Sequence, residues 1–157
     1  MSELVSSTKP DDFAVSLRIR HPSIDPVEIT RTLGLEPQHC WRAGEARRSL
    51  QGQPLEGVYH ESFWTGEFRD LEAGPQGGVA GEAILVQAVV QLRRSQKFLS
   101  RLQAEGGTVE LSVEAAGSGE VAFSLAPQLL SMLARCGISL SLHVQPETQL
   151  YERRKAS

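Results

Sequence analysis

The sequence is poor in cysteine, which limits its covalent stabilisation and its catalytic options. Cys40 and Cys136 are the two cysteines, too few and too far apart for a disulfide framework or a four-ligand zinc site. Cys136 precedes Gly137 at the end of an apolar helical pattern, where a thiol is typically a small buried hydrophobe. A chain of 157 residues can bury about two-thirds of its unfolded surface, so we expect free thiols and a core that needs no disulfide or metal cross-links.

Long apolar runs and an excess of positive charge are also absent. No stretch approaches the roughly 20 apolar residues of a membrane-spanning helix, and residues 1–12 lack the apolar core of a secretory signal. The formal net charge of −3 and the pI near 5.8 disfavour nonspecific binding to nucleic acid or to an anionic membrane. These absences predict a soluble, cytoplasmic protein with no nucleic-acid partner and no membrane partner.

Motifs of metal and nucleophilic chemistry are missing as well. The histidines, His21, His39, His60 and His143, show no chelating spacing. His39 and Cys40 are adjacent, so in a strand they point to opposite faces and do not form a nucleophile and base pair. The sequence therefore predicts no catalytic residue, no metal site and no cofactor.

The clearest positive signal is a short helix from about Pro26 to Leu33. Asp25 is its expected capping residue, accepting a hydrogen bond from the N–H of Glu28, and Pro26 fits the first helical position. Glu28 is expected to reach back and close a capping box. Gly34 can adopt the left-handed conformation that ends a helix.

Alternating apolar and polar residues predict several strands with one buried face and one wet face. In the segment after residue 57, aromatic residues such as Phe63 and Trp64 favour a strand, and we expect these rings to belong to the core. The predicted strands are residues 13–20, 39–42, 58–68, 109–115 and 138–145, with a short piece at 121–123.

Two further helices follow from apolar residues at helical spacing. Residues 82–104 form a helix that is either bent or divided at Ser95, where a second cap can begin. A later helix has Pro127 in its first turn and ends at Gly137. Residues 43–57 lack any period and are expected to form a long mobile loop.

The order of these elements predicts an α+β fold with a mixed, mainly antiparallel sheet and helices packed on one face. Its first part follows the ferredoxin-like βαββαβ order, with an appended strand-helix-strand. Residues 13–146 are expected to form one domain between a flexible leader, residues 1–12, and a solvated tail, residues 147–157. The glycine-rich segment 70–81 is expected to divide it into two halves of a pseudo-repeat.

The region of the first helix resembles a known family. Starting at Asp25, the chain reads Asp-Pro-x-x-Ile-Thr-x-x-Leu-Gly-Leu-x-Pro, and Trp-Arg-Ala-Gly follows at residues 41–44. This text resembles a bacterial family known only as domain of unknown function 4279. The resemblance extends more loosely over residues 13–145. It implies a small soluble α+β domain without an assigned reaction, and it transfers no site residues.

The best candidate site lies where the returning strand enters the long loop. Its residues are His39, Trp41, Arg42, Arg47 and Arg48. Trp41 can serve as a platform, and the guanidinium groups can grip an anion or a carboxylate. The alternative is that Trp41 packs in the core beside the helix and that the arginines are solvated.

We therefore predict a noncatalytic binding or protein-interaction module, with an acidic protein as the leading partner and a small anionic ligand as the next. The alternative is an enzyme or a small-anion-binding protein that uses the His39-Trp41-Arg42 region. Nucleic-acid binding is not expected, because the wet face of the sheet should lack the stacking rings of RNA-reading sheets. A homodimer and a monomer are equally compatible with one polar sheet face and an edge strand.

Overall fold

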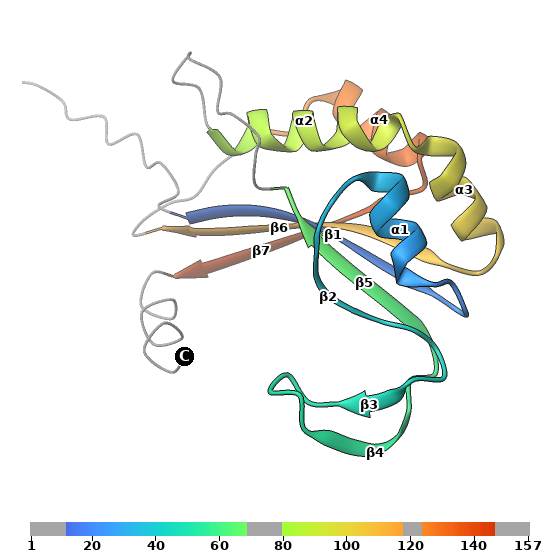
Figure 1. Cartoon of the computed structure of the whole chain (residues 1–157). Helices are drawn as coiled ribbons and strands as arrows, with labels where there is room; N and C mark the ends of the chain where they lie inside the picture. Colours follow the sequence, from blue (N-terminus) through green and yellow to red (C-terminus); the bar gives the residue numbers. More distant parts are fainter. Residues whose placement is uncertain (1–11, 69–79, 118–123, 147–157) are drawn as a thin grey trace, which may run out of the picture.

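The computed structural model describes residues 12–68, 80–117 and 124–146. Within these ranges a five-stranded sheet carries four helices on one face, and a two-stranded hairpin lies below its other face (Figure 1). In chain order the elements are β1 (Asp12–His21), α1 (Pro26–Leu33), β2 (Pro37–Trp41), β3 (Ala46–Arg48), β4 (Pro54–Val58), β5 (Ser62–Glu67), α2 (Ala80–Arg93), α3 (Gln96–Ala104), β6 (Thr108–Gly117), α4 (Pro127–Arg135) and β7 (Ser139–Pro146).

The large sheet has the strand order β2-β5-β1-β6-β7. Neighbouring strands are antiparallel except for β6 and β7, which are parallel and connected through α4. The predicted α+β class, with a mixed and mainly antiparallel sheet, is confirmed. The ferredoxin-like unit stays a prediction. The predicted strand at 121–123, residues 1–11 of the leader, the tail and most of the segment 70–81 lie outside the described residues, whereas Asp12, predicted as the end of the leader, begins β1.

The core lies between the helices and the sheet face that they cover (Figure 1). Val15, Leu17 and Ile19 of β1 are fully buried there, as their alternation predicts. The long helical pattern is divided into α2 and α3, and Ser95 precedes α3 without a capping hydrogen bond from its side chain. The other large side chains that are fully buried include Ile29, Trp64, Leu85, Val89, Leu92, Leu99, Leu102, Val109 and Leu111.

Helix α1 has the predicted bounds, but its first turn is capped differently. The Asp25 carboxylate accepts from the N–H of Val27 at 3.0 Å, whereas the N–H of Glu28 donates to the backbone oxygen of Asp25. Glu28 forms no capping box, because its carboxylate pairs with Arg101 of α3. Gly34 ends the helix with φ of 66°, and its N–H donates to the Thr30 carbonyl at 2.9 Å.

The interpretation of residues 43–57 as a loop is wrong, because this segment forms the β3–β4 hairpin. Its tight turn depends on Gly52, with φ of 81°, whose N–H donates to the Ser49 carbonyl at 2.9 Å. Every strand residue of the hairpin is exposed. Two wet faces remove the apolar period by which a strand is identified in a sequence.

The aromatic residues after residue 57 divide between the two faces of the sheet. Trp64 and Phe68 are buried in the core, as predicted. Phe63 is half-buried on the opposite face, because neighbouring residues of β5 alternate across the sheet, and Tyr59 stacks on Trp41 beneath it. The prediction that all these rings belong to the core is therefore wrong for Phe63 and Tyr59.

Candidate functional site

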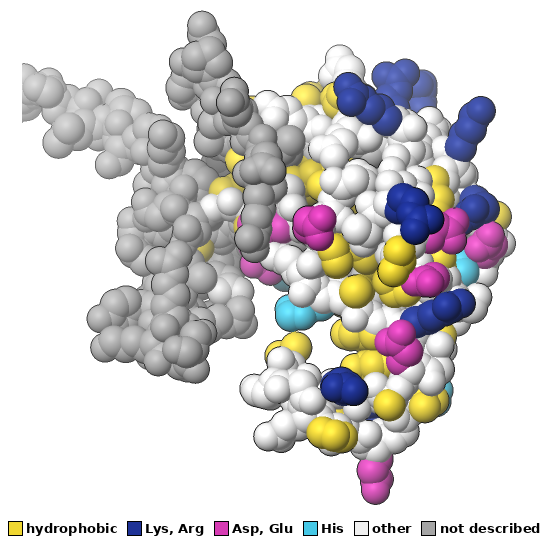
Figure 2. Space-filling view, in the orientation of Figure 1, with side chains coloured by type: hydrophobic (Ala, Val, Ile, Leu, Met, Phe, Trp, Pro, Cys, Tyr) yellow, Lys and Arg dark blue, Asp and Glu magenta, His cyan; other side chains and the backbone are white. Residues whose placement is uncertain are grey.

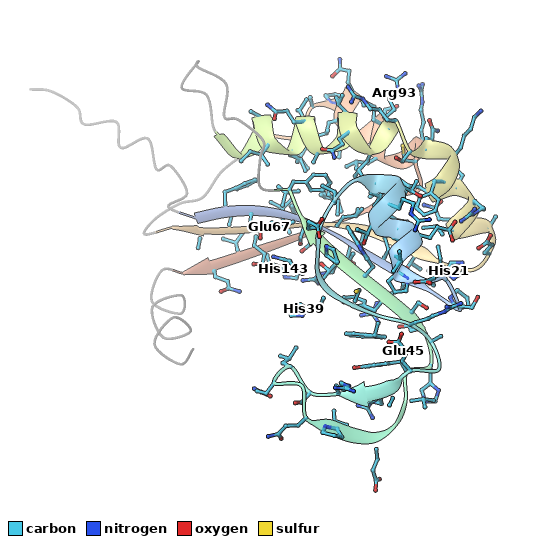
Figure 3. All side chains as sticks on the ribbon, viewed as in Figure 1. His21, His39, Glu45, Glu67, Arg93 and His143 are labelled. Atoms are coloured by element: carbon cyan, nitrogen blue, oxygen red, sulfur yellow. The ribbon has the colours of Figure 1, made fainter. Side chains whose placement is uncertain are left out.

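The face of the sheet opposite the helices is the candidate site, and strand register determines which residues share it. His39 and Trp41 of β2 pair with Thr65 and Phe63 of β5, so these four side chains project from the same face. Arg18 of β1 pairs with Thr65 in turn. Figure 3 shows His39 and His143 on this side of the sheet, with His39 above the hairpin. The hairpin therefore faces a mixed polar and aromatic surface.

An aromatic stack holds the hairpin in place below this face. The Trp41 ring lies 4.5 Å from the Tyr59 ring, at an interplanar angle of 14°, and 4.6 Å from the Phe63 ring. The Tyr59 hydroxyl donates to the backbone oxygen of Arg48 at 3.2 Å and accepts from its N–H at 3.1 Å. Aromatic stacking and these two hydrogen bonds thus join β3 to β2 and β5.

The same stack corrects two expectations about the wet face. Trp41 lies outside the core, on the face opposite the helices, and this face does carry aromatic rings. Phe63 stands between Trp41 and Arg20, whose guanidinium carbon lies 5.4 Å from the Phe63 ring centre. The Arg20 guanidinium forms an ion pair with the Glu61 carboxylate at 2.7 Å. The faces of Phe63 are therefore occupied by protein groups.

Between the sheet and the hairpin lies a cleft of about 290 Å³, and Figure 2 shows the hollow. Its lining combines an aromatic wall, an arginine, a histidine and two carboxylates. Leu50, in the turn of the hairpin, contributes to this lining although the residue is 86% exposed. The lining residues are Ala14, Ser16, Arg18, Gln38, His39, Trp41, Leu50, Phe63, Thr65, Glu67 and Glu114.

The ion pairs of Arg18 in the cleft are long. The Arg18 guanidinium lies 3.7 Å from Glu110 and 4.0 Å from Glu114, beyond hydrogen-bond distance. The Glu67 carboxylate accepts from the Gln38 amide at 2.7 Å. Exposed pairs of this length contribute at most a fraction of a kcal/mol, so Arg18 can turn toward a ligand at little cost.

The structure divides the predicted site into two groups. His39 and Trp41 line the cleft, whereas Arg42, Arg47 and Arg48 do not. The Arg42 guanidinium lies 3.5 Å from the Asp25 carboxylate, and Arg47 donates to the backbone oxygen of Glu56 at 3.4 Å. Arg48 is an exposed residue of β3.

Several lining residues were missed by the sequence argument. Arg18, Glu67 and Glu114 come from β1, β5 and β6, which are far apart along the chain. The alternation of apolar and polar residues in the sequence already places Arg18 and Glu114 on the solvent-facing side of the sheet. Their proximity to His39 depends on the strand order, with β1 between β5 and β6, which alternation does not contain.

The groups considered for catalysis lie apart. His39 and Cys40 project from opposite faces of β2, and His143 is on β7, at the other edge of the sheet. Four strand spacings separate β2 from β7, about 19 Å at 4.8 Å each. Within the described ranges, no cluster of three or more His, Cys, Asp or Glu side chains is placed to hold a metal ion.

Cys40 is the exposed thiol, and its surroundings make it less acidic. Partial burial raises the pKa of the Cys40 thiol, and the nearby carboxylates of Glu45 and then Asp25 raise it further. A nucleophilic cysteine needs the opposite, an electropositive environment that stabilises the thiolate.

The helices that the structure describes include none long and apolar enough to cross a membrane.

Comparison with protein-family models matches residues 11–147 to a family described as Domain of unknown function (DUF4279). The matched range contains all the helices and strands of the described residues. No curated protein matches the chain, and no solved structure matches it.

Proposed function

Since the chain belongs to the DUF4279 family, whose description names no activity, we propose its function from the geometry of the cleft. The protein is a noncatalytic binding module, and a small ligand enters between the hairpin and the open face of the sheet. The separation of His39, Cys40 and His143 supports binding over catalysis, because acid–base work requires such groups within hydrogen-bond reach.

The observation that carries this proposal is the cleft kept open by the Tyr59–Trp41–Phe63 stack. The stack attaches the hairpin at one end, and Leu50 at the turn contributes to the lining of the hollow. Ligand sites combine apolar walls with a few polar groups, and this lining has both. A volume near 290 Å³ lies at the small end of such sites, so it suits a small molecule.

Arg18 and His39 in the lining favour a ligand that carries a carboxylate. Arg18 presents the planar fork that binds carboxylates in a bidentate manner, and His39 faces it across Thr65. This arrangement supports the small anionic ligand of the sequence prediction, with Arg18 in the role that was given to Arg42.

An NMR titration with a panel of small carboxylates tests the proposal. We expect amide shifts in β1, β2, β5 and the hairpin turn that saturate with ligand concentration. Arg18→Gln should weaken binding at least tenfold, whereas Arg47→Gln, outside the lining, should not change it. Absence of saturable shifts with every carboxylate, or shifts centred on another surface, would refute a carboxylate-binding cleft.

The hairpin supports a second candidate, the docking of an acidic protein. Arg47 and Arg48 are exposed on β3, and three large apolar side chains are exposed beside them, Leu50, Leu55 and Val58. Apolar side chains next to arginines are typical of interfaces, with charge steering the encounter. Such a partner would bind the hairpin and, through Leu50, reach the edge of the cleft.

A lysate pull-down with a double variant tests this second candidate. Arg47→Ala together with Arg48→Ala should leave the melting temperature unchanged, because both side chains are exposed. Capture of an acidic protein should fall with the double variant and with added salt. If wild type and double variant retain the same proteins at all salt concentrations, the hairpin is not the docking surface.

A further inference from the structure

We infer that the ligand of the cleft is a small zwitterion with an apolar side group, of the α-amino-acid class. This inference rests on the proposed binding function and concerns the same cleft. It follows from the order in which apolar, cationic and anionic groups succeed one another along the cleft, and from hydrogen-bond acceptors at its acidic end.

The groups are ordered because open-face positions of a strand repeat every second residue. Along β5 these positions are Phe63, Thr65 and Glu67, with about 6.8 Å between successive side chains. Trp41 lies beside Phe63, and Arg18 lies beside Thr65. Along the cleft, the aromatic pair Phe63 and Trp41 is therefore followed by Thr65 with Arg18 beside it, and then by the carboxylate of Glu67.

The acidic end continues onto β6 and β7. Glu114 pairs with Ala14 of β1, one row beyond Glu67, and both carboxylates line the cleft. A second hollow of about 270 Å³ adjoins the cleft at Ala14, Glu67 and Glu114 and is also lined by Gln145. Acceptor oxygens thus dominate this end.

Two buried polar atoms lack a hydrogen-bond partner in the part of the chain that the structure describes, and one of them, an acceptor of Gln145, belongs to a residue that lines the second hollow. The two atoms are the Oε1 of Gln145 and the Oγ of Ser112. Ser112 is fully buried beneath the same face, paired with Ser16 of β1. An ammonium group brings three N–H donors and a positive charge, which Gln145 and the two carboxylates can accept.

A simple anion suits this lining less well than a zwitterion does. A carboxylate held by Arg18 would lie close to Glu114, and like charges repel. An ammonium on the same molecule offsets that repulsion, while the ligand's side group meets the exposed Leu50 and the ring edges of Trp41 and Phe63, whose faces are covered by protein groups. The three parts of an apolar α-amino acid therefore match the three parts of the lining.

Three matched compounds distinguish the charges that matter, with the full chain followed by NMR or calorimetry. L-Leucine carries both charges, N-acetyl-L-leucine lacks the ammonium, and L-leucinamide lacks the carboxylate; phenylalanine and methionine form parallel series. We expect at least one zwitterion to bind in the cleft, and each of its two derivatives to bind at least tenfold more weakly.

Two conservative variants assign each charge to a residue. Glu67→Gln should weaken zwitterion binding about tenfold and leave the N-acetyl compound unaffected or improved. Arg18→Gln should weaken both carboxylates and leave the amide unaffected. The comparison of the three compounds uses wild-type protein alone, so it tests the inference even if one of the two variants fails to fold.

The outcomes separate this inference from the binding function on which it rests. If the N-acetyl compounds bind as well as the zwitterions, the cleft recognises an anion alone, so the inference is overturned while the proposed function stands. If none of the compounds shifts cleft resonances but another carboxylate does, the amino-acid class is wrong. If neither these compounds nor the carboxylate panel shifts them, both are wrong.

Discussion

The indole Nε1 of Trp64 donates a hydrogen bond to the Oγ1 of Thr30 at 3.0 Å and so connects β5 to α1. The Thr30 hydroxyl in turn donates to the backbone oxygen of Pro26 at 3.3 Å. Trp64 is fully buried, so its N–H has no access to water. One threonine therefore satisfies the polar atom of the largest side chain in the core.

Thr30→Val should destabilise the fold, because it keeps the shape of the side chain but leaves the Trp64 N–H unpaired. An unsatisfied buried donor costs about 1–3 kcal/mol, and the free energy of unfolding in urea measures it. Thr30→Ser is the matched control, since it keeps the hydroxyl and should lose less. Equal stability of wild type and Thr30→Val would show that the hydrogen bond contributes nothing.

Gly34→Val should destabilise α1 through backbone strain alone. The φ of 66° at Gly34 is left-handed, and a Cβ built there meets no atom within 4 Å. A β-branched residue in this conformation costs more than about 1 kcal/mol, whereas Asn tolerates it better. We expect the melting temperatures to fall in the order Gly, Asn, Val. An unchanged melting temperature for Gly34→Val would contradict the assigned helix stop.

Trp41→Ala should loosen the hairpin while leaving the sheet intact. Loss of the stacks on Tyr59 and Phe63 removes about 0.5–1.5 kcal/mol each beyond the buried area. Hydrogen exchange should therefore accelerate about tenfold or more at the Tyr59 amide, which donates to Glu45, and hardly at all in β1. Tyr59→Phe keeps the ring and should have a smaller effect. Uniform acceleration across the domain would indicate instead that Trp41 supports the global fold.

Alkylation of Cys40 should be slow and strongly dependent on pH. Because burial and the carboxylates of Glu45 and Asp25 raise its pKa, less thiolate is present at a given pH than for a free cysteine. In a Cys136→Ser background, the iodoacetamide rate should rise with a midpoint above that of free cysteine. Glu45→Gln removes one negative charge and should shift the midpoint to lower pH. A midpoint at or below that of free cysteine would refute this description of the thiol.

Helix α1 shows what local sequence determines. Its cap, its proline at the first position and its Gly34 stop all act within a few residues, so the predicted bounds agree with the structure. The buried face of β1 was equally predictable, because a period of two residues defines it without reference to other strands. The partner of Glu28 could not be predicted from local sequence, because Arg101 lies on another helix and its ion pair with Glu28 replaces the capping box.

The candidate site shows what only the tertiary structure decided. His39 and Trp41 could be grouped from sequence because they are two residues apart on one strand. Arg18, Glu67 and Glu114 join them only because β1 lies between β5 and β6, which long-range pairing decides. The hairpin was predicted as a loop because exposure of both its faces removes the apolar period. Which rings lie outside the core depends on which side of the sheet the helices cover, and that choice is made by packing.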